Sequence, residues 1–220
     1  MNILVIAPHS DDELLGCGGV IAKNVFLGNS VFVCIATKGV EPLFAASIVQ
    51  KTRQELKLAH KYLGIKKTYF LDFPAVSLET VPRFELNGAI QKVVQEIQPD
   101  IMFLPHYGDM QMDHRIIFES CMVALRPKYK HVVKTAYTYE TLSETEWNIQ
   151  NTSNIFMPNV YFDISDFLDR KIVALEYYQT QLSDFPNPRS IEAVKSLARF
   201  RGSTINTYAA EAFSLIRSIY

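Results

Sequence analysis

The chain has 220 residues, of which 48% are hydrophobic, and this is enough for the core of one domain of ordinary to large size. Lys and Arg number 22 against 23 for Asp and Glu, so the net charge of -1 excludes the basic surface that nucleic-acid binding needs. No apolar run approaches the ~18 residues of a membrane span, and no signal-peptide pattern opens the chain. We therefore expect a cytoplasmic protein with no nucleic-acid partner and no transmembrane segment. Cys17, Cys34 and Cys121 lack metal-type pair spacing, which predicts buried, reduced thiols.

Short apolar runs alternate with amphipathic segments through the first half of the chain. The predicted strands cover residues 3–7, 31–36, 68–71 and 101–104, and the predicted helices cover residues 14–27, 48–63 and 86–97. Strands that alternate with helices of this length indicate βαβ units. We therefore predict an α/β fold in which one domain, residues 1–220, contains a mainly parallel sheet with helices on both faces.

The second half of the chain is less regular. A helix is predicted over residues 114–125, strands over 132–139 and 159–164, a helix capped by Ser165 and running through Leu182, and a last helix over 191–200. Residues 183–188 form a turn-rich break, and the segment from Tyr208 onward fits a helix or a strand. Residues 140–158 are polar and without periodicity, which indicates a lid or binding loop or else an irregular surface segment.

The first polar cluster, Pro8-His9-Ser10-Asp11-Asp12-Glu13, comes directly after the first predicted strand. Three carboxylates and an imidazole at the end of a buried strand need a counter-charge, and a metal cation is the simplest one. The alternative is a polar turn that caps a helix starting near Glu13, where acidic side chains suit the helix dipole.

A second polar cluster follows the fourth predicted strand. It contains His106, Asp109, Gln111, Asp113, His114 and Arg115. In a doubly wound sheet, strands one and four lie side by side, and the crevice at their carboxyl ends is the usual ligand site. We therefore expect the two clusters to converge on one site.

His9, Asp12 and His114 would bring two imidazoles and one carboxylate to that site and leave open positions on a metal ion. Asp11, the neighbour of a ligand, could take a proton from water that the metal makes more acidic. Asp113 could orient one of the imidazoles without binding the metal itself. This set predicts a catalytic metal centre.

The motifs together resemble the LmbE/PIG-L family of zinc-dependent de-N-acetylases. The resemblance rests first on the Pro8–Glu13 motif, Gly16-Cys17-Gly18-Gly19 and Gln111-Met112-Asp113-His114-Arg115. It continues through Arg53-Gln54-Glu55 with Ala59 and Leu63-Gly64, then Tyr139-Glu140, residues 156–160 and 163–165, Arg201-Gly202 and residues 210–213. It thus extends over nearly the whole chain.

The resemblance implies a Rossmann-like fold and removal of an N-acetyl group from an amino sugar, nucleotide sugar or glycoconjugate. It also implies that His9, Asp12 and His114 bind Zn²⁺ and that Asp11 is the general base. Family members commonly have histidine where this chain has Gln111, and glutamine cannot deliver a proton near pH 7. Asp11 or His106 would then protonate the leaving amine.

Contacts with the sugar are expected from Arg53 and from the segment between Tyr139 and Trp147, on the resemblance and the loop length alone. Arg53 is equally well explained as a solvated helix residue. The aromatic-rich carboxyl-terminal half could supply the interface of a homo-oligomer.

Three other functions fit parts of the pattern. A nucleotide-binding Rossmann protein is disfavoured because G-x-G-x-x-G fails at Ile21 and because the carboxylates would repel a pyrophosphate. The same two-histidine, one-carboxylate set also serves non-haem iron, although the strand-helix alternation disfavours that use. The third alternative, to which Gln111 lends support, is a catalytically impaired metal-binding relative that acts as a binding or assembly protein.

Overall fold

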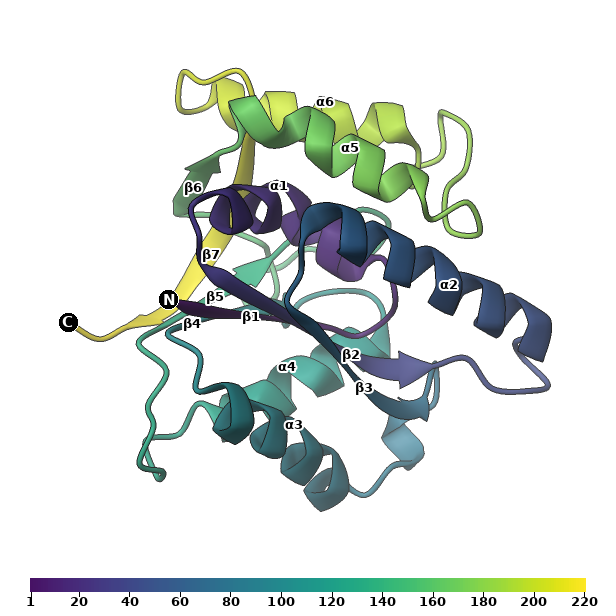
Figure 1. The fold of residues 1–220 in the computed structure, drawn as a ribbon, viewed down its shortest axis with the longest axis vertical. Helices are drawn as coiled ribbons and strands as arrows, with labels where there is room; N and C mark the ends of the chain where they lie inside the picture. The colour runs from purple at the N-terminus through teal and green to yellow at the C-terminus, as the bar shows by residue number, and fades with distance from the viewer.

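A seven-stranded sheet forms the centre of the computed structural model, which describes residues 1–220, and helices cover both of its faces (Figure 1). The strands are β1 (Asn2–Ala7), β2 (Ser30–Lys38), β3 (Lys67–Pro74), β4 (Ile101–Pro105), β5 (Thr135–Tyr139), β6 (Val160–Asp163) and β7 (Ala210–Ser218). The helices are α1 (Asp12–Phe26), α2 (Ala46–Leu63), α3 (Arg83–Ile97), α4 (Met112–Ala124), α5 (Leu168–Glu176) and α6 (Ile191–Ser203), with 3₁₀ turns η1 (Leu78–Thr80) and η2 (Ser165–Phe167). None of the helices combines the length and the apolar character that a membrane span needs.

The strand order is β3-β2-β1-β4-β5-β7-β6. The first five strands of this order pair in parallel, while β7 runs antiparallel to β5 and β6. The predicted single α/β domain with a mainly parallel sheet is therefore confirmed. Because the sheet grows in one direction from β1 to β3 and in the other from β4 onward, the carboxyl ends of β1 and β4 flank a crevice.

The two faces of β1 pack against two different groups of helices. Ile3, Val5 and Ala7 belong to the core cluster that includes α1, α2 and α5, whereas Leu4 and Ile6 belong to the cluster that includes α3 and α4. Neighbouring residues of a strand point to opposite faces of the sheet. The apolar residues 3–7 of β1 are therefore buried on both faces of the sheet.

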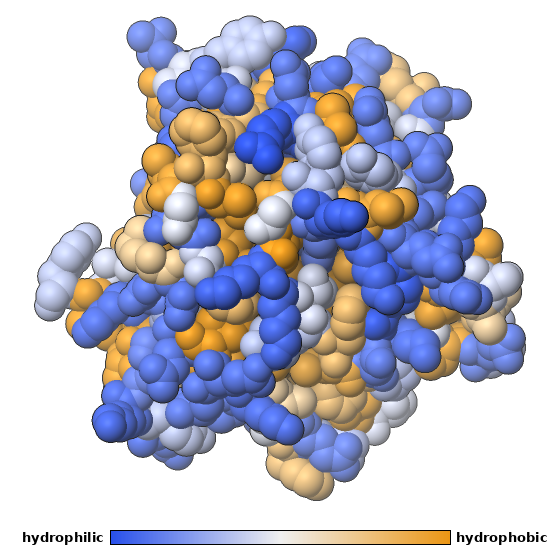
Figure 2. Space-filling model, in the orientation of Figure 1, coloured by the Kyte–Doolittle hydropathy of each residue, from blue (hydrophilic) through white to orange (hydrophobic).

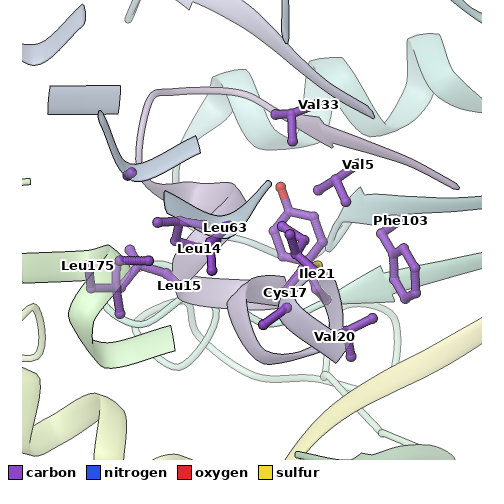
Figure 3. Close-up of a cluster of buried hydrophobic side chains, with 14 of the residues drawn as sticks. Val5, Leu14, Leu15, Cys17, Val20, Ile21, Val33, Leu63, Phe103 and Leu175 are labelled. Carbon is purple, nitrogen blue, oxygen red and sulfur yellow. The ribbon is translucent and has the colours of Figure 1, made fainter. Parts of the chain in front are cut away.

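Helix α1 lies inside the protein, because α5 packs over the side of α1 that faces away from the sheet (Figure 1). Its first 11 residues are all buried. Figure 3 shows this cluster, to which α1, the sheet and α5 contribute, for example, Leu14, Val5 and Leu175. A Cβ atom at Gly16 would lie 2.2 Å from Cδ2 of Tyr139, so only glycine permits this approach of helix and sheet. The glycines after the first motif, Gly16, Gly18 and Gly19, thus serve close helix packing.

Polar side chains cover much of the outer surface, with smaller apolar areas between them on the face that Figure 2 shows. All three cysteines, Cys17, Cys34 and Cys121, are buried and free. The prediction of buried thiols without disulfides is therefore confirmed.

The prediction of one helix over residues 165–182 is wrong at both ends. The hydroxyl of Ser165 donates to Asp163 Oδ1 (2.5 Å) and caps no helix, and η2 precedes α5. The helix then ends early because the amide and the hydroxyl of Thr180 both donate to Glu55 of α2 (3.2 and 2.5 Å). The carboxyl-terminal segment, for which helix and strand were both open, forms β7.

Candidate metal centre and substrate cavity

The polar clusters after β1 and β4 meet where these strands lie side by side. β1 pairs in parallel with β4, so the two carboxyl ends lie at the same edge of the sheet. His9 follows β1, Asp12 begins α1, and His114 lies in the first turn of α4. The fold therefore brings together residues that are more than 100 positions apart in the chain.

His9, Asp12 and His114 direct one ligand atom each toward a common point, and these atoms lie within 4.8 Å of one another. Asp12 Oδ2 is 3.3 Å from His9 Nδ1 and 3.3 Å from His114 Nε2. The side chains of Asp12 and His114 are fully buried, whereas the His9 side chain is 24% exposed and lines a cavity. Two imidazoles and one carboxylate form a ligand set that suits zinc and leaves a position open.

Two buried atoms of this set, Asp12 Oδ1 and His114 Nε2, have no hydrogen-bond partner. Leaving a buried polar atom unpaired costs about 1–3 kcal/mol, so such atoms need an explanation. A cation held at this point would satisfy both atoms and would balance the surrounding carboxylates. The residues therefore fit a bound metal ion.

Carboxylates behind the imidazoles fix the ring orientations. His114 Nδ1 is 2.8 Å from Asp109 Oδ2, and Asp109 Oδ1 accepts the hydroxyl of Thr145 (2.6 Å). His9 Nε2 is 3.0 Å from Asp113 Oδ2, and Asp113 also accepts two backbone amides from the segment after β3. Partners of this kind orient metal-binding histidines. Asp113 thus lies where an orienting group is needed, and Asp109 is a second such group whose role the sequence pattern does not reveal.

These carboxylates favour positive charge at the imidazoles. Burial by itself lowers the pKa of His9, but hydrogen bonds to Asp113 and Asp12 outweigh it and raise this pKa to about 9. Burial also lowers the pKa of His114, and the charge of Asp12 with the hydrogen bond to Asp109 raises it to about 10. The same attraction suits a metal ion, which competes with protons for these ligands.

Asp11 has a backbone φ of 116°, which residues other than glycine rarely adopt. Such a conformation costs of order 1–3 kcal/mol and persists where the surrounding structure holds it, often at functional sites. Asp11 is 2% exposed and lines the cavity beside the metal ligands. Burial raises the pKa of Asp11 to about 7, against the opposing effect of Arg189.

The cavity beside the metal ligands has a volume of about 300 Å³. It is lined by residues 9–11, 37–39, 75 and 76, Phe44, Ile48, Val49, Thr52, Arg53, Gln111, Glu144, Gln181 and Arg189. This volume is at the lower end of the range for small-molecule pockets. The cavity therefore suits a small substrate or one part of a larger one.

Arg189 is a residue of this site that the sequence analysis missed. Its guanidinium group donates to the carboxylate of Asp11, to Ser143 Oγ (2.9 Å) and to Glu144 Oε1 (3.4 Å). Arg189 follows the turn-rich break after α5, and Glu144 lies in the loop after β5. The long polar loop thus contributes to the site through Glu144, but no local pattern marks Arg189, because only the fold brings these segments together.

Arg189→Met removes the cation that Asp11 and Glu144 share. We expect the free energy of unfolding to fall by about 1–3 kcal/mol, because buried oxygens lose a hydrogen-bonded partner. Arg189→Lys should recover only part of this loss, since an ammonium group cannot span the oxygens that a guanidinium fork reaches. Urea unfolding of the three proteins measures the difference. Equal stabilities would show that the ion pairs contribute nothing.

Comparisons with known proteins identify the family. The model of the PIG-L family, described as GlcNAc-PI de-N-acetylase, matches residues 4–125, which is more than half of the chain. The chain belongs to this family. The resemblance that the motifs indicate is therefore confirmed. Among PIG-L relatives, the probable N-acetyl-alpha-D-glucosaminyl L-malate deacetylase 2 of Bacillus anthracis is 28% identical over 197 residues, covering 83% of this chain and 82% of the relative.

Solved structures share the fold over nearly the full length. The N,N'-diacetylchitobiose deacetylase of Pyrococcus horikoshii matches with a TM-score of 0.79 at 24% identity, covering 98% of this chain and 83% of the other. The 4-carboxy-2-hydroxymuconate hydratase of Pseudomonas putida also matches with a TM-score of 0.79, at 19% identity over 100% and 97% of the chains. A deacetylase and a hydratase share this fold, so the fold alone does not identify the reaction. The reaction has to be inferred from the residues of the site.

Gln111, where the resemblance leads us to expect a histidine, is the N-cap residue of α4. Its side-chain oxygen accepts the amide of Asp113 and so caps α4. Its amide nitrogen lies 3.5 Å from His9 Nε2, and the residue lines the cavity. With the oxygen engaged in the cap, the amide nitrogen is the group of the Gln111 side chain that remains free to donate a hydrogen bond.

Arg53 lines the cavity and is held in place by its neighbours. It forms an ion pair with Asp72 and lies 3.9 Å over the ring of Phe70. Its side chain is only 20% exposed, so it is not a fully solvated helix residue. A role in substrate binding remains a proposal that this location supports.

His106 does not reach the cavity. It is 1% exposed, and its Nε2 donates to the carbonyl oxygen of Asn154 (2.8 Å) while its ring packs against Phe156. The loop after β5 thus covers His106, and the lining of the substrate cavity does not include this residue. The structure therefore corrects the prediction that His106 could protonate the leaving amine.

Tyr139 is a core residue and contacts no substrate. It is fully buried, its ring packs on Gly16, and its hydroxyl donates to the carbonyl oxygen of Ile6 (2.9 Å). Its place at the end of β5 is near the site, but its side chain points into the core. The structure therefore corrects the prediction of a sugar contact.

Tyr139→Phe should consequently affect stability and leave substrate binding unchanged. The carbonyl oxygen of Ile6 loses its side-chain donor, which costs about 1–2 kcal/mol of the free energy of unfolding. Thermal or urea unfolding measures this cost, and the KM for the substrate should equal that of the wild type. A raised KM with unchanged stability would instead show that Tyr139 contributes to substrate binding.

Proposed function

We propose that the protein is a zinc-dependent hydrolase that removes the N-acetyl group from an amino sugar or a sugar conjugate in the cytoplasm. The observation that carries this proposal is the meeting of His9, Asp12 and His114, two of whose buried atoms form no hydrogen bond, beside the cavity that Asp11 lines. Membership of the PIG-L family and a relative named as a deacetylase of an acetylglucosaminyl conjugate support the substrate class.

The zinc ion would be held by His9, Asp12 and His114. Asp109 and Asp113 support this assignment, because each lies within hydrogen-bond distance of a ligand imidazole on the side away from the common point. When bound, zinc supplies Lewis-acid chemistry: it polarises a carbonyl group and lowers the pKa of water.

The protein's own residues move the proton and orient the substrate. Asp11 takes a proton from the water that attacks the acetamide carbonyl carbon. The amide nitrogen of Gln111 donates a hydrogen bond to the developing oxyanion. When the C–N bond breaks, Asp11 returns the proton to the nitrogen, and the acetic acid formed passes its own proton to the released amine, which leaves acetate and an ammonium group. Since His106 lies outside the cavity and Gln111 carries no transferable proton near pH 7, Asp11 serves in both steps.

Acetate release from a panel of N-acetylated monosaccharides, nucleotide sugars and glycoconjugates tests the proposal. We expect release from at least one member and loss of that release with a chelator. The panel should include 4-carboxy-2-hydroxymuconate, because a protein of the same fold is named as its hydratase. Hydration of this compound without any acetate release would contradict the proposed function, and zinc binding with neither reaction would favour a binding or assembly protein.

A further inference from the structure

Glu13 is a buried carboxylate that neither the metal site nor the cavity uses. Its Oε2 accepts the backbone amide of Asp11 (3.0 Å), and its Oε1 accepts the hydroxyl of Tyr178 (2.6 Å) and lies 3.1 Å from His60 Nε2. Each of these four residues is at most 4% exposed. The carboxylate thus ties the start of α1 to α2 and to the turn after α5.

The donors around Glu13 are themselves fixed. His60 Nδ1 lies 2.7 Å from Thr68 Oγ1, so the tautomer that donates to Glu13 from Nε2 accepts the Thr68 hydroxyl at Nδ1. Burial and the neighbouring Glu13 hold the pKa of Tyr178 well above its usual value, so its hydroxyl keeps the proton that it donates. None of Glu13, His60, Thr68 and Tyr178 lines the cavity.

We infer that Glu13 is a positioning residue for Asp11. By accepting the amide of Asp11, it holds the backbone at the φ of 116° that sets the direction of the Asp11 carboxylate. The hydrogen bonds from Tyr178 and His60 remove the freedom of Glu13 to follow any movement of Asp11. The inference rests on the proposed function, because Asp11 is the base of the proposed reaction.

The alternative is that Glu13 has a purely structural role and only caps the first turn of α1. A cap requires only the amide of Asp11, whereas Glu13 also meets two donors from other elements. Glu13→Gln keeps the size of the side chain but offers one acceptor oxygen to three donors. The neutral amide oxygen is a weaker acceptor than a carboxylate, so the hydrogen bond from the Asp11 amide weakens even where Tyr178 and His60 turn to accept from the NH₂ group.

Glu211 of β7 provides a matched control, because its side chain holds the same helix, α1. Its carboxylate is also buried and accepts the α1 amides of Gly19 (2.8 Å) and Val20 (2.7 Å) together with the ammonium group of Lys171 (2.7 Å). Glu211→Gln is thus the same chemical change at a buried site that fixes α1, but it makes no contact with Asp11. Any effect that comes only from weakening α1 should appear in both variants.

The test compares Glu13→Gln, Glu211→Gln and Tyr178→Phe in the zinc-loaded protein. The readouts are the NMR-detected hydrogen exchange of the Asp11 amide, zinc content, and kcat and KM for acetate release. In Glu13→Gln we expect faster exchange of the Asp11 amide and a kcat lower by about 10- to 100-fold, the usual effect of losing an orienting partner, with KM and zinc content unchanged. Tyr178→Phe should shift both readouts in the same direction by less, and Glu211→Gln should shift neither.

Three results would overturn the inference. The first is wild-type exchange of the Asp11 amide in Glu13→Gln, the second is an equal fall of kcat in Glu13→Gln and Glu211→Gln, and the third is a loss of zinc that accounts for the fall. If the wild type released no acetate from any substrate, the proposed function would fail. Exchange of the Asp11 amide would still decide whether Glu13 holds this residue.

Discussion

Asp11→Asn should abolish acetate release while the protein keeps its zinc. Asparagine has the size of aspartate, but its amide cannot accept a proton from the attacking water or return one to the amine. General acid-base catalysis contributes roughly 10²- to 10⁴-fold, and one residue here serves both steps, so we expect a loss at the upper end of this range. Acetate release and zinc content, measured on the same sample, give the result.

Asp169→Asn is the control for this substitution, because it makes the same change on an exposed residue of α5. It should keep wild-type turnover. If Asp11→Asn also kept wild-type turnover with zinc bound, Asp11 would not be the base. If it lost zinc in proportion to activity, Asp11 would act on the metal site and the assignment would equally fail.

His114→Ala should remove both the zinc and the activity. The substitution deletes one of three ligand atoms and leaves Asp12 and Asp109 facing an empty space without their imidazole partner. Loss of an orienting partner alone costs 10- to 100-fold in metal affinity, so loss of a ligand should cost at least about 100-fold. Elemental analysis after dialysis measures the zinc that remains per chain.

His131→Ala is the matched control for the ligand variant. His131 lies away from the site and bonds the carbonyl oxygen of Pro99 (2.8 Å). It should keep the wild-type zinc content. If the His114→Ala protein kept its full zinc content, His9, Asp12 and His114 would not be the set of zinc ligands.

The fold and the convergence of the ligand candidates could be predicted because their signals are local. β1, β2 and β4 are short apolar runs, and the alternation with helices favours the doubly wound order with β1 beside β4. His9 and His114 follow the ends of those two strands, so the topology alone brings them together. The rest of the sheet, in which β7 is antiparallel, carries no such signal.

The remaining parts of the site depend on contacts that no local pattern encodes. Arg189 enters the cavity from the turn before α6, and Asp109 supports His114 from the loop after β4. The resemblance and the loop length predict a sugar contact for Tyr139, and the position after β4 places His106 in the polar cluster, but a residue at a strand end can face either the cavity or the core. Packing on Gly16 turns Tyr139 inward, and the loop after β5 covers His106.

A zinc titration of metal-free protein tests the central claim most directly. Acetate release from the best substrate of the panel and bound zinc should be measured in the same samples as zinc is added. We predict that activity rises in proportion to bound zinc and stops rising at one ion per chain, and that His114→Ala protein stays inactive throughout. Full activity of the metal-free wild type, or saturation with zinc without any acetate release, would contradict the account.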